Sequence, residues 1–246
     1  MRKGSIPGKN GYDIPYVDNT CGKDRVLFIT HGFTSSKECP TNQLLAGALP
    51  GHGIGTFAID LPAHGDSPVD GEYLRLSNCL SDIDSACAYV RRICPGVRLY
   101  FFGSSFGAYL TLRYLSADDR RDNQAFLRSA AVDMPGIFRR NHSDEIAREL
   151  NVNGCFTISE DCVRPLKITK GFLTDLEQYG PADPAKAPAK LHMIHGSGDS
   201  VAPYADAQAF AKAAGCPLTT VPGAEHRLDE PGQPELVLKT ALDFFG

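Results

Sequence analysis

The chain has 246 residues, of which 42% are hydrophobic and 22% are charged, which is the size and composition of a single globular domain. Its formal net charge of −4 excludes the basic surface that nucleic-acid binding requires, and it contains no apolar run long enough to predict a membrane span. Residues 1–19 are polar and lack the apolar stretch of a secretion signal, so we expect a cytoplasmic protein.

Eight cysteines are spread along the chain, and none of them forms a C-x-x-C pair. A domain of this length does not depend on disulfides, and a chain without a secretion signal normally keeps its thiols reduced. We therefore expect free thiols and no zinc site, with a bridge between Cys155 and Cys162 left open. The cysteines stand at positions 21, 39, 79, 87, 94, 155, 162 and 216.

Short, almost continuously apolar runs alternate with helical patterns along the chain. Runs of this kind are typical of parallel strands that are covered on both faces. The order predicts an α/β fold with a doubly wound, mostly parallel sheet, in which ligands bind beyond the carboxyl ends of the strands. Strands are predicted at 25–31, 55–61, 98–103, 127–134, 190–195 and 217–221, and helices at 77–93, 106–115, 204–214 and 234–245.

One stretch interrupts this alternation. From Pro135 to Pro188 no clean strand is predicted, and charged and turn residues are mixed with short helical patches. Long insertions in compact domains usually carry function, so we expect a small lid rather than an irregular surface loop. The predicted organisation is a core of residues 1–134 and 189–246 with a lid or cap insertion at 135–188.

The segment Gly103-Ser104-Ser105-Phe106-Gly107 fits the pattern G-x-S-x-G between a predicted strand and a predicted helix. In that context the serine occupies a strained turn that directs its hydroxyl away from the sheet. The flanking glycines allow the strand and the helix to approach without a side-chain clash. The register of the motif selects Ser105, rather than Ser104, as the candidate nucleophile.

A serine nucleophile needs a general base, and the base needs an acid that orients it. His226 is the preferred base because it alone lies between the last predicted strand and the final helix. Asp199 is the preferred acid because it follows the strand that ends at His195, which produces the order serine, acid, histidine. Asp133 is the alternative acid, and Asp206 is expected to be a solvated helix residue. The seven histidines are His31, His52, His64, His142, His192, His195 and His226.

The same chemistry needs two N–H groups to stabilise the oxyanion of the reaction. The first predicted donor is the backbone N–H of Phe106, the residue after the nucleophile. The second is the N–H of Phe33, in the loop that follows the first parallel strand, where Gly32 permits a sharp turn. The Phe33 side chain is also a candidate for lining the pocket.

Several other polar residues in these loops are expected to hold the backbone rather than to react. His31 is predicted to hold the Phe33 loop by hydrogen bonds. Asp60 and His64 are predicted to satisfy backbone groups of the tight loop after the second parallel strand. His195 is assigned to loop architecture, and Glu225, beside His226, is expected to be a solvated carboxylate.

Together these blocks resemble the α/β-hydrolase superfamily and, within it, small bacterial carboxylesterases of the cinnamoyl or feruloyl esterase group. The resemblance extends from Arg25 to the C-terminus and implies a triad of Ser105, His226 and Asp199, no cofactor, and hydrolysis of a small-molecule carboxylic ester through an acyl-enzyme. Ser104 departs from the pattern, since relatives often have His there. The blocks are His31-Gly-Phe-Thr34, Asp60-Leu-Pro-Ala-His-Gly-Asp-Ser67, Gly103-Ser-Ser-Phe-Gly107, His195-Gly-Ser-Gly-Asp199 and Gly223-Ala-Glu-His226.

Two other kinds of function stay open on the residues alone. The first is another acyl hydrolase that uses the same triad, namely a peptidase, a thioesterase or a lactonase. The second is a ligand-binding protein on a hydrolase scaffold, because function resides in sites and not in folds. Serine at the nucleophile position argues against dehalogenase chemistry and against dienelactone chemistry with a thiol. The natural substrate is undetermined, and a homodimer is left open.

Overall fold

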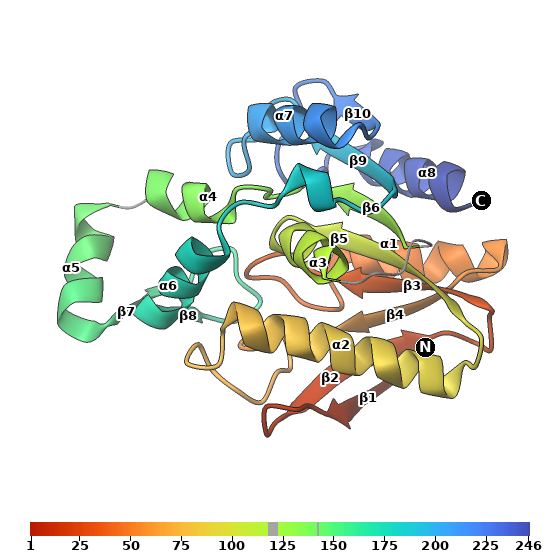
Figure 1. The fold of residues 1–246 in the computed structure, drawn as a ribbon, viewed down its shortest axis with the longest axis horizontal. Helices are drawn as coiled ribbons and strands as arrows, with labels where there is room; N and C mark the ends of the chain where they lie inside the picture. The colour runs from red at the N-terminus through yellow and green to blue at the C-terminus, as the bar shows by residue number, and fades with distance from the viewer. Residues whose placement is uncertain (118–122, 142) are drawn as a thin grey trace.

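The computed structural model describes residues 1–117, 123–141 and 143–246, so His142 lies outside the described residues. An eight-stranded sheet with the order β1-β2-β4-β3-β5-β6-β9-β10 forms its centre (Figure 1). The strands from β4 to β10 in this order pair in parallel, whereas β1 and β2 are antiparallel. The strands are β1 (Arg2–Pro7), β2 (Asp13–Asn19), β3 (Arg25–Thr30), β4 (Gly55–Ile59), β5 (Arg98–Ser104), β6 (Gln124–Arg128), β9 (Lys190–Gly196) and β10 (Leu218–Val221).

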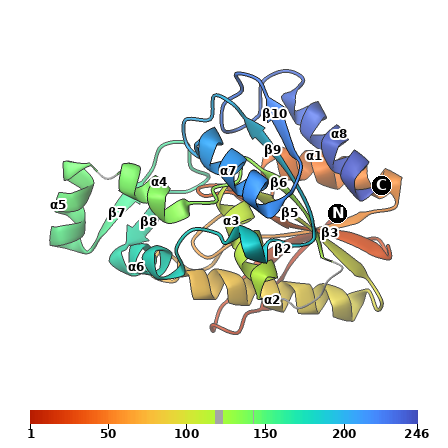
Figure 2. The same ribbon diagram turned by 45° about the horizontal axis from the view of Figure 1, so that its top comes forward.

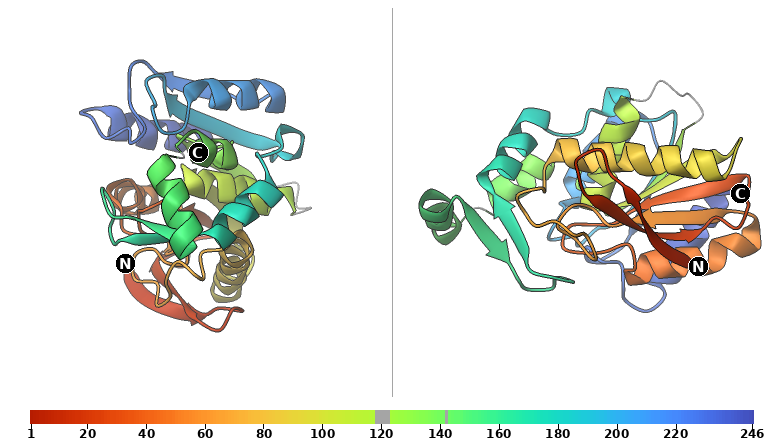
Figure 3. Two further views of the ribbon diagram at one scale, coloured as in Figure 1. Left: turned by 90° about the vertical axis from the view of Figure 1, so that its left-hand side faces the viewer. Right: turned by 90° about the horizontal axis from the view of Figure 1, so that it is seen from below.

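The apolar strands are buried on both faces because helices cover both sides of the sheet. Along β3, Val26 and Phe28 pack into one hydrophobic cluster, while Leu27 and Ile29 pack into another, as the two-residue repeat of a strand requires. The first cluster includes α2, α3 and α7, and the second includes α1 and α8. Figure 3 shows α1 and α2 on opposite sides of the strands. The helices are α1 (Pro40–Ala48), η1 (Leu49–His52), α2 (Leu76–Ile93), α3 (Phe106–Ser116), α7 (Tyr204–Ala214) and α8 (Gln233–Phe245).

The segment 135–188 lies almost entirely outside the main sheet. Its α-helices and a separate two-stranded sheet gather at one side of the molecule, away from both termini (Figures 1 and 2). Its elements are α4 (Met134–Arg140), α5 (Asp144–Asn153), β7 (Cys155–Ile158), β8 (Leu166–Thr169), α6 (Lys170–Tyr179) and η2 (Pro184–Lys186).

Three details differ from the sequence-based predictions. The strand predicted at 127–134 instead spans Gln124–Arg128, because Ser129 turns the chain with a φ of 47° and Asp133 caps α4. The stretch 135–188, where no strand was predicted, contains the β7–β8 hairpin. The N-terminal strands and α1 were not predicted, and β2 adds to the sheet only through its pairing with distant β4.

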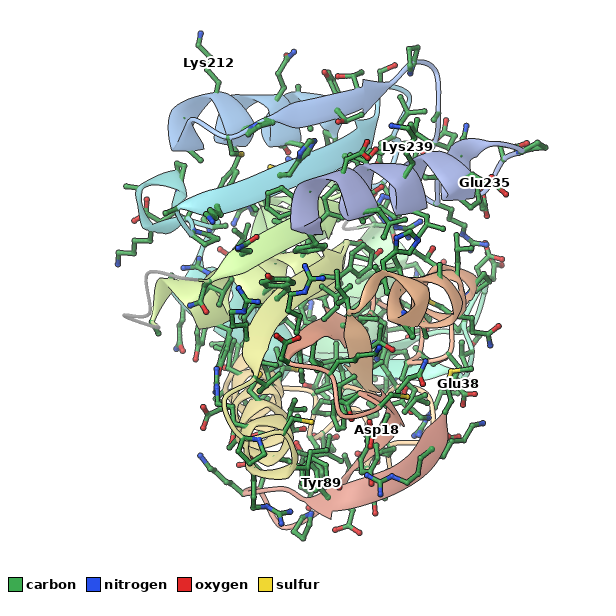
Figure 4. The ribbon with its side chains drawn as sticks, turned by 90° about the vertical axis from the view of Figure 1, so that its right-hand side faces the viewer. Asp18, Glu38, Tyr89, Lys212, Glu235 and Lys239 are labelled. Atoms are coloured by element: carbon green, nitrogen blue, oxygen red, sulfur yellow. The ribbon has the colours of Figure 1, made fainter. Side chains whose placement is uncertain are left out.

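The outer surfaces of the helices carry charged side chains. Lys212 of α7 and Glu235 of α8 are exposed and project outward (Figure 4). At the edge of the sheet, Arg2 of β1 pairs with Asp18 of β2 at 2.6 Å. Among the described residues, no helix is both long and apolar enough to cross a membrane.

Candidate active site

The turn between β5 and α3 holds Ser105 in an uncommon backbone conformation. Its φ of 53° and ψ of −115° lie outside the regions that most residues prefer. The turn is tight because a side chain at Gly107 would collide with the carbonyl oxygens of Thr30 and His31, and one at Gly103 would lie 2.6 Å from the Ala108 Cα. The Ser105 N–H donates to the Arg128 carbonyl at 2.9 Å, which ties the turn to β6.

The structure brings the three predicted residues Ser105, His226 and Asp199 into one chain of hydrogen bonds. The Ser105 Oγ lies 2.9 Å from His226 Nε2, and His226 Nδ1 lies 2.8 Å from Asp199 Oδ2. Because an ionised carboxylate only accepts hydrogen bonds, Nδ1 carries the proton and Nε2 has a free lone pair for the serine hydroxyl. This tautomer is the one in which a histidine can remove the serine proton.

The Asp199 carboxylate accepts hydrogen bonds on both oxygens. Its Oδ1 accepts from the N–H groups of Val201 and Ala202, and its Oδ2 lies 2.9 Å from His195 Nε2 as well as near His226. Burial by itself raises the pKa of Asp199, but the hydrogen bonds from His195 and His226 outweigh it and hold the pKa below its usual value. Asp199 is therefore ionised at neutral pH.

His195 contacts the Asp199 carboxylate, which was not predicted from the sequence. It was assigned only to loop architecture, yet the buried ring donates toward the Asp199 carboxylate and the Ala202 carbonyl, each at 2.9 Å. Both partners are acceptors, so Nε2 carries the proton. The four-residue spacing between His195 and Asp199 across a glycine-containing turn was the available signal. Glu225, expected to be only solvated, accepts from the Ser200 N–H and hydroxyl.

The loop after β3 lies directly against the nucleophile turn. A side chain at Gly32 would come within 3.4 Å of the Ser105 Cβ. Phe106 is the first residue of α3, and the first N–H groups of a helix have no partner within that helix. The loop that carries Phe33 and the first turn of α3 are therefore adjacent at Ser105. The rings of Phe33 and Phe106 meet edge to face, with their centroids 5.3 Å apart.

Buried polar groups hold two loops, as expected: His31 holds the loop after β3, and Asp60 and His64 hold the loop after β4. His64 Nδ1 lies 2.8 Å from the Pro62 carbonyl oxygen, and Asp60 Oδ2 accepts from the Asp66 N–H at 2.8 Å. His31 Nε2 accepts from the Leu61 N–H at 3.1 Å, and burial lowers its pKa to about 4. Burial also lowers the pKa of His64 to about 3, so both rings are neutral. Asp60 accepts from the Lys37 N–H at 2.8 Å and from Lys37 Nζ at 2.6 Å.

The Ser105 hydroxyl borders a cavity of about 500 Å³. The wall is mostly apolar and comes largely from α4, α5, α6, β7 and adjoining residues, while the core contributes Phe33, Ala131 and Val201 beside Ser105. Besides Ser105, the polar side chains of the lining are Arg139, Asn141 and Glu177, and both Glu177 oxygens bond to Arg139. The lining apolar residues of α4 to α6 include Met134, Ile137, Phe138, Ile146, Leu173 and Leu176.

The two other aspartates that were considered lie elsewhere. Asp133 caps α4 by accepting from the Gly136 N–H at 2.9 Å and lies near Arg139 and Arg140, so it is not brought to His226. Asp206 lies on α7 and pairs with Arg140 of α4 at 3.0 Å. The alternative assignment of Asp133 was based on the predicted strand 127–134, which ends earlier than expected.

Within the described parts of the chain, no group of three or more His, Cys, Asp or Glu side chains is arranged to hold a metal ion. Cys155 and Cys162, the pair for which a bridge was left open, are both free thiols.

Residues 22–150, just over half of the chain, match the family described as "Serine aminopeptidase, S33". No curated protein matches the sequence. Many solved structures are similar to this chain, and the following three are among those that match nearly all of it. A putative hydrolase from Agrobacterium vitis S4 is 20% identical with a TM-score of 0.81, and covers 100% of this chain and 99% of its own. Est1E from Butyrivibrio proteoclasticus, solved with ferulic acid bound, is 22% identical with a TM-score of 0.83 and coverages of 98% and 97%. Mouse alpha/beta hydrolase domain-containing protein 10 is 14% identical with a TM-score of 0.76 and coverages of 100% and 98%.

Proposed function

The chain belongs to the serine aminopeptidase S33 family and has the α/β-hydrolase fold, and from this premise we propose that it is a serine hydrolase that cleaves carboxylic esters through an acyl-enzyme. The observation that carries the proposal is the hydrogen-bonded chain from Ser105 through His226 to Asp199 at the edge of a cavity. The family name refers to peptide bonds, so the choice of esters is a separate step of the proposal.

In the proposed reaction, the Ser105 Oγ adds to the ester carbonyl while His226 Nε2 takes its proton. The ionised Asp199 stabilises the imidazolium that forms. His226 then donates this proton to the leaving alcohol as the carbon–oxygen bond breaks, which leaves an acyl group on Ser105. A water molecule, deprotonated by His226, adds to the acyl carbon. The bond from this carbon to Ser105 Oγ then breaks, and His226 returns the proton to Oγ as the acid leaves.

The N–H groups of Phe33 and Phe106 are the proposed oxyanion donors. The Phe106 N–H lies at the N-terminus of the eleven-residue helix α3, where the helix dipole also favours negative charge. Fixed donors of this kind act without reorganising during the reaction, and the loss of one typically costs roughly 10²–10³ in kcat.

The cavity supports a substrate with a bulky apolar group. A space of about 500 Å³ with a mostly apolar wall favours an acyl or alcohol group with aromatic or branched carbon over a short acetyl group. The bound ferulic acid of the Est1E structure is an aromatic acid, which makes hydroxycinnamate esters the first substrates to test. The segment 135–188 is proposed to be the lid, because it supplies most of this wall.

The lining argues against a peptide with a free amino terminus. Such a substrate needs a carboxylate at the site to pair with its ammonium group. Glu177 is the carboxylate in the described lining, and Arg139 occupies both of its oxygens at 2.7 and 2.8 Å. The pocket therefore favours an uncharged group.

The proposal is tested by treating the protein with a fluorophosphonate and locating the adduct by mass spectrometry, in parallel with Ser105→Ala. We expect one adduct, on the Ser105 peptide, that is absent in the variant. Hydrolysis of acetate, octanoate and hydroxycinnamate esters, of a thioester, of a lactone and of an aminoacyl anilide then identifies the substrate class. If the folded wild-type protein is not labelled and hydrolyses none of these substrates, the proposal is wrong. A ligand-binding function on a hydrolase scaffold would then take its place.

A further inference from the structure

The carboxyl end of β6 contacts both halves of the candidate site. The strand ends at Arg128, and Ser129 follows with a φ of 47°, a conformation that serine seldom adopts. The Ser129 N–H donates to the Ile194 carbonyl of β9 at 2.9 Å, so the turn is fixed within the sheet. This placement brings both side chains to the loop that carries His226.

The loop that carries His226 is held by both side chains. The Ser129 hydroxyl donates to the His226 carbonyl at 2.7 Å. The Arg128 guanidinium donates to the carbonyl of the next residue, Arg227. Two successive carbonyls of the His226 loop are thus bonded to two successive residues of β6 and its turn.

The same arginine also contacts the turn that carries Ser105. Its Nη2 and Nε lie 2.8 and 3.1 Å from the Ser104 Oγ, and the Arg128 carbonyl accepts from the Ser105 N–H at 2.9 Å. Ser104 is the residue immediately before the candidate nucleophile. A small hydroxyl at this position accepts from the guanidinium and leaves room for it.

We infer that Arg128 and Ser129 are positioning residues which hold His226 at hydrogen-bond distance from Ser105. This inference rests on the proposed function, because it concerns the geometry of the same reaction. The two loops are far apart in the sequence, and the 2.9 Å distance between Ser105 Oγ and His226 Nε2 depends on how both loops sit on β6. A displacement of about 1 Å in such a pair can lower kcat by roughly 10²-fold.

The guanidinium of Arg128 is charged. The titratable groups around it are the Cys39 thiol ahead of α1, Asp199 after β9, and Arg227 and Asp229 after β10. Burial lowers the pKa of Arg128, yet a guanidinium keeps its charge at neutral pH. The charge strengthens its hydrogen bonds to the Ser104 hydroxyl and to the Arg227 carbonyl.

The test uses the rate of fluorophosphonate labelling of Ser105 from pH 5 to 9, together with kcat and KM on an ester that wild type hydrolyses. Arg128→Met removes the hydrogen bonds and the charge, Arg128→Lys keeps the charge, and Ser129→Ala removes one hydroxyl. Arg25→Met is the matched arginine control, because Arg25 also donates to two backbone carbonyls, those of His52 and Phe245, at the amino end of β3. Ser85→Ala is the matched serine control, because Ser85 Oγ donates to the Ser81 carbonyl on α2.

We expect Ser129→Ala and Arg128→Lys to lower kcat about 10-fold or more with KM changed less than about 2-fold, while both controls stay within about 2-fold of wild type. We expect Arg128→Met, which removes the hydrogen bonds and the charge together, to lower kcat further than Arg128→Lys, again with KM changed less than about 2-fold. Melting temperatures check that the variants are folded, and if Arg128→Met does not fold, the other two variants decide.

Wild-type rates in both folded Arg128→Lys and Ser129→Ala would overturn the inference. So would equal losses in the two controls, because the effect would then be general destabilisation. If wild type itself is neither labelled nor active, the proposed function fails first, and this outcome is seen before any variant is made.

Discussion

At the residue scale, the carboxylate that faces His226 is chosen by hydrogen bonds rather than by proximity in the sequence. Asp199 accepts from two backbone N–H groups and from two imidazoles, whereas Asp133 is engaged as a helix cap. The surroundings of Asp199 therefore favour a permanently ionised acid next to the base. That property stabilises the imidazolium in the proposed mechanism.

We expect Asp199→Asn to lower kcat by about 10³–10⁴-fold, because an amide in this place would stabilise the wrong tautomer of His226. The matched control is Asp133→Asn, which should retain activity within about 3-fold, since it loses only part of a cap. Steady-state kinetics on the best ester of the panel measure both. Comparable losses in the two variants would mean that Asp199 is not the acid of the site.

At the element scale, the contact between α3 and β3 determines whether the nucleophile turn can form. Gly107 on α3 has no room for a side chain, while Gly47 on α1 has no heavy atom within 4 Å of an added Cβ. We expect Gly107→Ala to destabilise the fold by about 3 kcal/mol or more through overpacking. Gly47→Ala should stabilise it by about 0.5–1 kcal/mol through helix propensity. Urea unfolding of both variants measures the difference, and a mild effect at Gly107 would contradict the close packing of α3 on β3.

A second element-scale prediction concerns α6, which forms one wall of the cavity. Leu173→Trp would fill part of the space next to Ser105. We expect kcat/KM for a hydroxycinnamate ester to fall about 10-fold or more, with little change for an acetate ester. Leu236→Trp is the control, because Leu236 is also partly buried but lies on α8 beneath the other face of the sheet. An equal loss for both esters would place the bulky group outside this cavity.

At the scale of the whole molecule, a buried carboxylic acid couples the N-terminal hairpin to α2. The Tyr12 hydroxyl donates to Asp82 Oδ2 at 2.9 Å, and burial raises the pKa of Asp82 to about 7. In the unfolded chain an aspartate has a pKa of about 3.9. The folded state therefore binds this proton more tightly, so its stabilising contribution is complete below about pH 4 and is lost as the pH rises to about 7.

Asp82→Asn stays neutral at all pH values. We therefore expect its free energy of unfolding to rise relative to that of wild type by about 1–4 kcal/mol as the pH is raised from 5 to 8. Urea unfolding at the two pH values measures this gain. Asp84→Asn is the control, because Asp84 lies on the same helix, is exposed and pairs with Lys9. If the free energy of unfolding depends on pH in the same way in wild type and in Asp82→Asn, ionisation of Asp82 does not destabilise the fold and the prediction is wrong.

Features that depend on neighbouring residues could be predicted before the fold was known. The buried strands follow from their unbroken apolar runs, and most of their bounds and those of α2, α3, α7 and α8 agree with the structure within a residue or two. The glycines around Ser105 mark a turn between a strand and a helix. Because parallel strands end at the same edge of a sheet, the order of Ser105, Asp199 and His226 was enough to predict that they meet.

Contacts between segments that are distant in the sequence became visible only in the folded chain. The β1–β2 pairing, the β7–β8 hairpin and the apolar cavity wall depend on partners far along the chain, and short strands carry too little pattern to predict them. His195 on Asp199, and Arg128 with Ser129 on the His226 loop, involve common residue types in loops. What distinguishes them is the angle and the distance at which the sheet places one loop against another, and these are set by packing rather than by local residue preference.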